Sequence, residues 1–192
     1  MIRLVRTGCI VPLIAIALAG CVSPPAPKYQ AAIANTELLI KQSTKLAAGD
    51  FTAAAGVSNR SLGMRGSQLN GGSDGTFSTY LHDALTTELQ TAARYDPSSE
   101  LRISGVLTRN ELNTGIKTGS ATVGGEFSLT RGNTVCFKKT LVAEHQWESS
   151  FIGAVAIPAA IDNYSTTVQK LLGELFSDPD FTAALQPMGG TP

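Results

Sequence analysis

The residue with the most clearly defined chemistry is Cys21, which ends the run Leu18-Ala19-Gly20-Cys21. The chain opens with two arginines and no acidic residue, and an apolar stretch follows from Cys9 to Gly20. That stretch has about a dozen residues, which is too short to cross a bilayer but has the length and flanks of a secretory signal. We therefore predict that residues 1–20 are a signal peptide and that cleavage makes Cys21 the first residue.

The same run resembles the lipobox of bacterial lipoproteins, in which a leucine and two small residues precede an invariant cysteine. The resemblance implies that a dedicated signal peptidase recognises Leu18, Ala19 and Gly20. It also implies that the thiol of Cys21 carries diacylglycerol, with an acyl chain such as palmitate on the new amino terminus. Several chains hold a protein to a membrane more firmly than the marginal grip of one. Val22 in place of an aspartate implies sorting to the outer membrane, with the domain on its periplasmic face. The alternative is a plain secretory signal that ends near this cysteine by chance.

The composition indicates one near-neutral domain. Cleavage removes 20 of the 192 residues, and the remaining 172 are enough for a single hydrophobic core. The signal takes two of the 15 basic residues, leaving 13 against 15 acidic ones, whereas a nucleic-acid role needs a concentrated basic face. Cys136 is the only other cysteine in the mature chain, so no intramolecular disulfide is expected, and we predict a buried, inert thiol there.

Proline spacing divides the mature chain. Pro24, Pro25 and Pro27 favour an extended, semi-rigid backbone, so residues 21–34 are predicted to be the acylated cysteine and a tether. Residues 35–186 are predicted to form a single domain, and residues 187–192 a flexible tail.

Apolar residues at helical spacing predict two amphipathic helices. The first covers residues 77–94 with Asp74 or Thr76 as its cap, and the second opens with Pro158 in its first turn. A short terminal helix is expected after Asp178, which a proline follows at the first helical position.

Alternation of apolar and polar residues predicts strands that begin near Leu101 and Ala121, and a returning strand over Thr134–Trp147 with Val135 and Phe137 on its buried face. A further strand is expected over Thr36–Lys41, which contains a short apolar run. The fold class predicted from this order is α+β, a mostly antiparallel sheet of about four to five strands with two amphipathic helices packed on one face.

Reactive side chains are few. His82 lies beside Asp83 on the polar side of the first predicted helix, and His145 lies in the returning strand. No His-x-x-x-His or Cys-x-x-Cys spacing supports a zinc site, and no Gly-x-Ser-x-Gly turn supports a serine nucleophile. We therefore expect no metal, no cofactor beyond the covalent lipid, and no enzymatic activity.

Three residues are candidates for binding a partner. Lys117 lies in Asn110–Ser120, where glycines flank the lysine, and this segment is expected to be either a mobile binding loop or a long disordered hairpin connection. Trp147 and Phe151 lie where the returning strand leads into the second helix. One interpretation is an aromatic patch for a protein or a lipid, and the alternative is that Trp147 is a core residue that closes this corner.

The layout as a whole resembles small Gram-negative envelope lipoproteins. The similarity rests on Leu18–Cys21, on the order of helices and strands, and on the ending from Tyr164 through Leu171-Leu172 and Leu175-Phe176 to Asp178-Pro-Asp180-Phe181. It looks like the YajG-like lipoproteins and, more distantly, the lipoprotein partner of the lipopolysaccharide translocon and the auxiliary lipoproteins of lipid-exporting ABC systems. Such a resemblance implies a class and not a ligand, and it transfers no catalytic residue.

These observations favour a membrane-anchored periplasmic lipoprotein that acts as a non-catalytic binding or assembly module of the cell envelope. Its expected partner is another envelope protein or a lipid, and not a nucleic acid. A second hypothesis is a lipid or glycolipid binding or transport role, with the ligand in a groove between the helices and the sheet. A third is an envelope hydrolase with an unrecognised site, for which His82 and His145 are the first residues to substitute.

Overall fold

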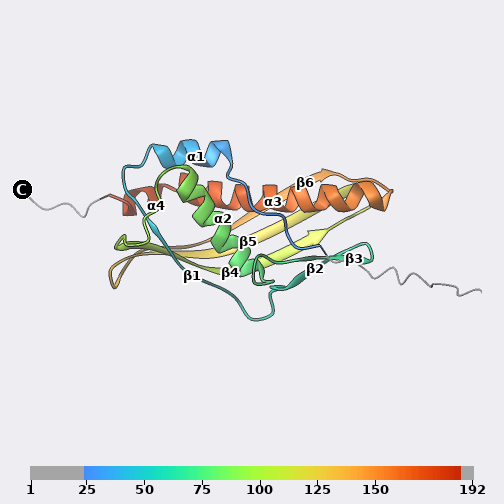
Figure 1. Cartoon of the computed structure of the whole chain (residues 1–192), viewed down its shortest axis with the longest axis horizontal. Coiled ribbons are helices and arrows are strands. Elements are labelled where there is room, and N and C mark those ends of the chain that lie inside the picture. Colours follow the sequence, from blue (N-terminus) through green and yellow to red (C-terminus); the bar gives the residue numbers. More distant parts are fainter. Residues whose placement is uncertain (1–23, 187–192) are drawn as a thin grey trace, which may run out of the picture.

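The computed structural model describes residues 24–186, with the helices gathered on one side of a long sheet (Figure 1). In chain order its elements are α1 (Ile33–Ile40), β1 (Ala47–Ala53), β2 (Ser61–Met64), β3 (Ser67–Asn70), α2 (Phe77–Thr91), β4 (Leu101–Asn113), β5 (Thr118–Arg131), β6 (Thr134–Glu148), α3 (Gly153–Ser177) and α4 (Pro179–Ala184).

The main sheet has the strand order β1-β4-β5-β6, and a separate hairpin pairs β2 with β3. β4, β5 and β6 are antiparallel neighbours, whereas β1 is parallel to β4. Parallel neighbours need a crossover connection, and here the β2–β3 hairpin and α2 provide it. The predicted α+β fold with a mostly antiparallel sheet is therefore confirmed, with one parallel edge strand added.

Two helices cover one face of this sheet, as predicted. α2 packs against β1 and β4, α3 packs along β5 and β6, and α1 lies against both helices. Phe77 of α2, Phe127 of β5 and Tyr164 of α3 are fully buried in the common core. No helix within residues 24–186 combines the length and apolarity that crossing a membrane requires.

Local signals set the start of α2 and the β5–β6 turn. The hydroxyl of Thr76 accepts the N–H of Thr79 at 3.3 Å, and the carboxylate of Asp74 accepts the N–H of Thr76 at 2.8 Å. Gly132 sits in the turn with φ 55°, a left-handed conformation that favours glycine. Both features follow from residues close in the sequence, which is why the sequence predicted them.

The strand predicted over Thr36–Lys41 is wrong, because most of these residues belong to α1. Asn35 and Leu39, four positions apart, are buried, whereas Ile40 is exposed. This is helical spacing, since a strand would place alternate residues on one face. A short apolar run does not distinguish a buried strand from a helix, and packing against α2 and α3 decides for the helix.

Two predicted boundaries also shift. α3 begins at Gly153, so Pro158 lies inside the helix rather than in its first turn. Proline has no N–H to donate to the carbonyl four residues before it, and that carbonyl belongs to the exposed Ala154, where water can take its place. The mobile loop predicted over Asn110–Ser120 is mostly strand, because β4 runs to Asn113 and β5 starts at Thr118.

β6 departs from the predicted alternation near its start. Phe137 pairs with Leu129 of β5, but Val135 pairs with Thr130, so Cys136 is an extra residue on β6. The bulge turns Val135 outward to an exposure of 58%. Cys136 is a free cysteine that is half-buried, which corrects the prediction of a buried thiol.

The tether predicted for residues 21–34 is corrected over its described part, because residues 24–34 pack on the domain. Pro25 forms a parallel bridge with Asn70 of β3. The N–H of Asn70 donates to the Pro24 carbonyl at 3.1 Å, and the N–H of Ala26 donates to the Asn70 carbonyl at 2.8 Å. Tyr29 is buried in the core. The prolines indicate an extended backbone correctly, but their pattern carries no information about what that backbone pairs with.

Asp178 joins the α3–α4 corner to β6. Its carboxylate accepts the N–H groups of Asp180 at 2.9 Å and Phe181 at 3.1 Å, and it lies 2.7 Å from the Lys139 ammonium. Burial by itself would raise the pKa of this carboxyl. The hydrogen bonds from Lys139 and from the two backbone N–H groups outweigh burial, so the pKa of Asp178 lies below its ordinary value.

Asp178→Ala is expected to lower the free energy of unfolding by about 1–2 kcal/mol at neutral pH, because α4 loses its N-cap. A depressed pKa stabilises the fold above the unfolded pKa of about 3.9, and the stabilisation is lost as pH falls through the folded pKa. Urea unfolding should therefore show the gap between wild type and variant narrowing in acid. Asp180→Ala removes an exposed partner of the same lysine and is the control, with little expected loss. Equal losses in the two variants would contradict this role of Asp178.

Candidate functional site

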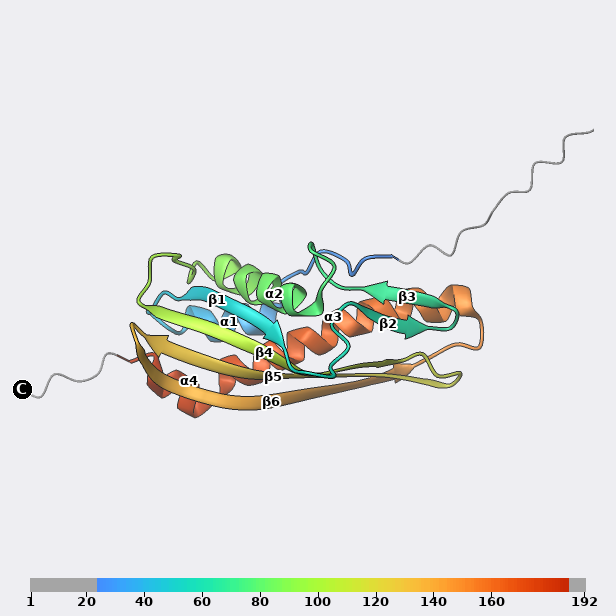
Figure 2. The same cartoon turned by 90° about the horizontal axis from the view of Figure 1, so that it is seen from below.

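The predicted site residues fall into two groups. Leu18, Ala19, Gly20 and Cys21 lie outside the described residues, so their predicted roles rest on the sequence alone. The other three residues come together at one end of the molecule. There the β2–β3 turn lies beside the β4–β5 and β6–α3 connections (Figure 2).

Arg65 holds this end together. It lies in the β2–β3 turn, where its Nε donates to the carbonyl of Thr114 at 2.7 Å and its Nη2 to the carbonyl of Gly115 at 2.7 Å. Its Nη1 donates to the carbonyl of Phe151 at 3.0 Å. A guanidinium presents its donors in a rigid fork, so one side chain fixes the β4–β5 connection and the β6–α3 connection together.

Lys117, Trp147 and Phe151 share this end but not the same environment. The Lys117 side chain is exposed, and its carbonyl accepts the N–H of Ser149 at 2.8 Å. Trp147 is half-buried, and its ring covers Gly119 so closely that a Cβ there would lie 2.3 Å from the ring. Phe151 is exposed. Trp147 thus packs into the corner, while Phe151 is free to contact a partner.

Phe151 belongs to a group of exposed apolar side chains, Ile116, Phe151, Ile152 and Val155, which we call the apolar tip. Their exposed fractions are 65%, 80%, 57% and 55%, respectively. Large aliphatic and aromatic residues are usually buried, so their gathering at one end is informative. The sequence analysis found only Phe151. The signal that it did not use is the absence of any charged residue over residues 149–161.

The start of α3 fits this description. α2 and α4 begin on Thr76 and Asp178, whose side chains accept backbone N–H groups. The N-cap of α3 is Ile152, which forms no side-chain cap, and Ala32 of α1 likewise forms none. An apolar residue therefore occupies the position where polar caps are usual in helices that face water.

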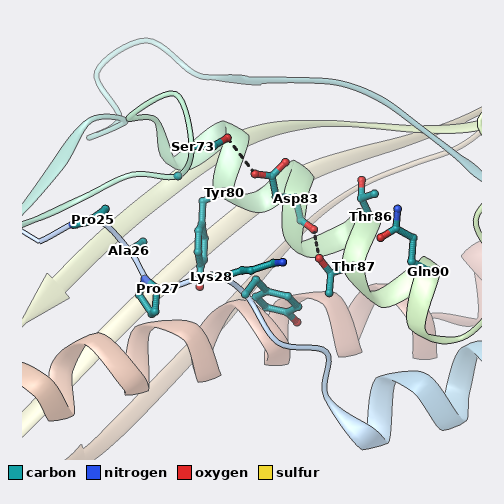
Figure 3. Close-up of a pocket in the computed structure, with 12 residues that line it drawn as sticks. Pro25, Ala26, Pro27, Lys28, Ser73, Tyr80, Asp83, Thr86, Thr87 and Gln90 are labelled. Carbon is teal, nitrogen blue, oxygen red and sulfur yellow. Dashed lines mark hydrogen bonds between the residues drawn. The ribbon is translucent and has the colours of Figure 1, made fainter.

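A pocket of about 490 Å³ lies between the N-terminal segment and α2 (Figure 3). Figure 3 shows Tyr80 and Lys28 extending into the space between these elements. This volume is within the range of small-molecule sites. The lining residues are Pro25, Ala26, Pro27, Lys28, Tyr29, Gly72, Ser73, Tyr80, Asp83, Thr86, Thr87 and Gln90. The pocket differs from the groove that the sequence analysis placed between helices and sheet, where large core side chains are fully buried.

Glu88 of α2 holds the N-terminal segment that forms one wall of this pocket. Its Oε1 accepts the Tyr29 hydroxyl at 2.6 Å, the Ala32 N–H at 3.1 Å and the Asn35 amide at 2.9 Å. Glu88 is fully buried. Burial, followed by the hydrogen bond to Glu88, raises the pKa of Tyr29 far above its ordinary value, so the phenol remains a donor.

Sequence reasoning missed Glu88, although the signal was present. The residue lies three and four positions after Leu85 and Ala84, on the apolar stripe of α2. An acid at such a position needs buried hydrogen-bond partners, because an unsatisfied buried carboxylate is costly. The partners come from residues more than fifty positions earlier in the chain.

The two histidines are not brought together. His82 of α2 lies 3.2 Å from the Asp83 carboxylate and packs beside Phe51 of β1. His145 lies in β6, at the opposite edge of the sheet. Lys170 can only donate, so Nδ1 of His145 accepts from it at 2.8 Å and Nε2 donates to Asn163 at 2.8 Å. Within the part of the chain that the structure describes, no group of three or more His, Cys, Asp or Glu is placed to hold a metal ion.

Comparison with known proteins identifies the fold. No family model matches the chain, and no curated protein matches it. The structure is similar to the crystal structure of protein XCC0632 from Xanthomonas campestris, of family DUF330, with a TM-score of 0.51 and 16% identity over 81% of this chain and 91% of that one. A "putative lipoprotein" from Caulobacter crescentus CB15 aligns at a TM-score of 0.44 and 13% identity, over 79% of this chain and 95% of that one. The similarity to XCC0632 shows a shared fold alone.

Glu88→Ala is expected to lower the free energy of unfolding by about 3 kcal/mol, because two buried donors and one part-buried donor lose their acceptor. Trypsin cleavage after Lys28 should also become faster, since the N-terminal segment loses its attachment to α2. Denaturant unfolding and timed proteolysis measure the two effects. Glu37→Ala, on the exposed side of α1, is the matched control. If both variants were as stable and as resistant as wild type, Glu88 would not hold the segment.

Proposed function

We propose that this chain is a lipid-anchored protein of the bacterial cell envelope, whose domain binds or helps to assemble other envelope components without catalysing a reaction. On this proposal Cys21 carries the lipid, and the domain faces the periplasm from the outer membrane, as Val22 favours. The observation that carries the proposal is the run Leu18-Ala19-Gly20-Cys21 only three residues before Pro24, where the described domain begins.

The attachment of the N-terminal segment supports this role. Pro24 and Ala26 are hydrogen-bonded to Asn70, and Tyr29 is bonded to Glu88. A lipid on Cys21 would thus be joined almost directly to the packed domain. An anchor so close to the domain restricts its orientation, and the surface away from the membrane stays available to a partner.

Several polar side chains that could take part in catalysis already form hydrogen bonds within the protein, which favours a binding role over hydrolase activity. Oδ1 of Asn110 accepts the Tyr164 hydroxyl at 2.9 Å, and its Nδ2 donates to the carbonyl of Ser58 at 2.7 Å. Both ring nitrogens of His145 are similarly occupied. Because His82 lies at the other edge of the sheet, a hydrolase would have to work without the two histidines acting as a pair.

The finer family assignment also belongs to the proposal. We favour the YajG-like lipoproteins and, more distantly, the auxiliary lipoproteins of ABC systems and the lipoprotein partner of the lipopolysaccharide translocon. The basis is the ending from Tyr164 to Phe181 together with the lipobox-like run.

Cys21→Ser is expected to abolish incorporation of a palmitate analogue and to leave the precursor unprocessed, because serine offers no thiol to carry diacylglycerol. In-gel detection of the analogue and mass spectrometry of the amino terminus measure the result. Cys136→Ser is the matched control, since it removes the other cysteine of the mature chain and should label like wild type. Normal labelling of the Cys21 variant would overturn the anchor.

A second candidate function, lipid or glycolipid binding, is favoured by the pocket beside α2. Its volume of about 490 Å³ suits a headgroup or part of an acyl chain. Lys28 provides a cation in the lining, and Tyr80 and the prolines provide apolar surface. The pocket combines the charge and the apolar contact that an amphipathic ligand requires.

Thr87→Trp is expected to fill this pocket and to displace a bound lipid. Thr91→Trp lies one turn further along α2, is exposed and does not line the pocket, so it should retain the lipid. Native mass spectrometry of protein purified from membranes in mild detergent compares the two variants with wild type. Wild-type protein without any non-covalent lipid, or equal retention in the two variants, would count against this role.

A further inference from the structure

We propose that the apolar tip is seated at the boundary between headgroups and acyl chains of the membrane that carries the Cys21 lipid, so that the domain stands on this end. The inference rests on the proposed lipid anchor and adds a second contact and an orientation to it. The occupant of the tip is the lipid bilayer itself.

The backbone beneath the tip is held in place. Arg65 binds three backbone carbonyls from the two connections that carry Ile116 and Phe151. The hydrogen bond from the Ser149 N–H to the Lys117 carbonyl joins these connections directly. A backbone held in this way can present large apolar side chains for insertion into a membrane.

Exposed apolar residues elsewhere are scattered. Ile33 and Ile40 lie on α1, and Val135 and Val142 lie on β6. At the tip, by contrast, four such residues come from the β4–β5 connection, the β6–α3 connection and the first turn of α3, which adjoin one another. Residues 149–161 carry no charge, which lowers the cost of bringing the start of α3 to a lipid surface.

The described chain enters the domain from the side of the tip. The bridge between Pro25 and Asn70 is parallel, so the chain here runs in the same direction as β3. Traced backward from Pro24, it points toward the β2–β3 turn that contains Arg65. Figure 2 shows the start of the described chain, in blue, in the half of the molecule that holds this turn.

Chain lengths agree with a shared membrane surface. From Asn70 back to the first residue of β3 is about 10 Å, at the rise of a β-strand. The three residues from Pro24 to Cys21 reach at most about 11 Å. The reach of the anchor therefore matches the distance back to Ser67, next to the β2–β3 turn that holds the tip connections, and one membrane surface can receive both the lipid and the tip.

Lys117 adds a matching charge. Its exposed ammonium follows Ile116 directly, on a flexible stem. Such a side chain can place its charge at a headgroup phosphate while the neighbouring isoleucine contacts the acyl region. Glu148, at the end of β6, is also exposed and pairs with Thr118 beside this lysine, so an acidic group shares this end of the molecule.

The test places a fluorophore at the tip of the full-length, processed protein. Phe151→Cys in a Cys136→Ser background is labelled with bimane, since acylation occupies the Cys21 thiol. The protein is reconstituted into phosphatidylethanolamine and phosphatidylglycerol vesicles that contain brominated acyl chains. Val135→Cys is the control, because it is also exposed and lies about 40 Å away at the other end of β6. Quenching at position 151 should exceed that at 135 roughly threefold or more, as expected for insertion to interfacial depth. Val155→Cys repeats the measurement if Phe151→Cys does not fold.

Incorporation of a palmitate analogue is measured on the same preparation, so that the two proposals fail separately. Acylated Cys21 with no quenching at 151, or with equal quenching at 151 and 135, overturns the tip and leaves the anchor. Absence of acylation overturns the anchor and the inference with it. A blue shift at 151 that follows protein concentration without vesicles assigns the tip to a second copy. If the bimane at position 151 is shielded from water only when envelope protein is added, the apolar tip binds a protein partner. Each of these last two results overturns the lipid assignment.

Discussion

The structure depends on covering the one apolar face of a long antiparallel meander. β4, β5 and β6 run for 13, 14 and 15 residues, and β5 in the middle is buried along most of its length. A face of this length needs the 25 residues of α3, with α2 beside it over β1 and β4. The burial of Phe77, Phe127 and Tyr164 in one core follows from that coverage, as does the place left for α1 and the N-terminal segment.

Glu88 connects this core to the start of the domain. A buried carboxylate is stable only when donors surround it, and here the donors come from Tyr29, Ala32 and Asn35. The same interaction positions α1 and gives the pocket its second wall. A segment with the composition of a semi-rigid tether is thereby part of the folded domain.

At the end of the sheet that carries the apolar tip, backbone contacts rather than buried side chains hold the connections. There, the connections are held through their backbone by Arg65, while their large side chains point to the outside. Because Arg65 binds backbone carbonyls, the side chains of these connections are not needed to hold the fold and can serve to contact a partner. The start of the packed N-terminal segment and the exposed apolar tip are therefore two separate features that lie in the same half of the domain.

The sequence by itself determined what depends on neighbouring residues. The signal-like start, the amphipathic helix from Phe77, the Asp178 cap and the alternation of β4 and β5 are local patterns, and the packing of two helices on one sheet face follows from them. Tertiary structure alone decided that residues 33–40 form a helix, that Pro24 to Tyr29 pack on the domain, and that the N-terminal segment supplies the donors for Glu88. It also decided that Phe151 is exposed while Trp147 packs against Gly119. These outcomes depend on contacts between residues far apart in the chain, and no periodicity in one segment records what the other segment will place against it.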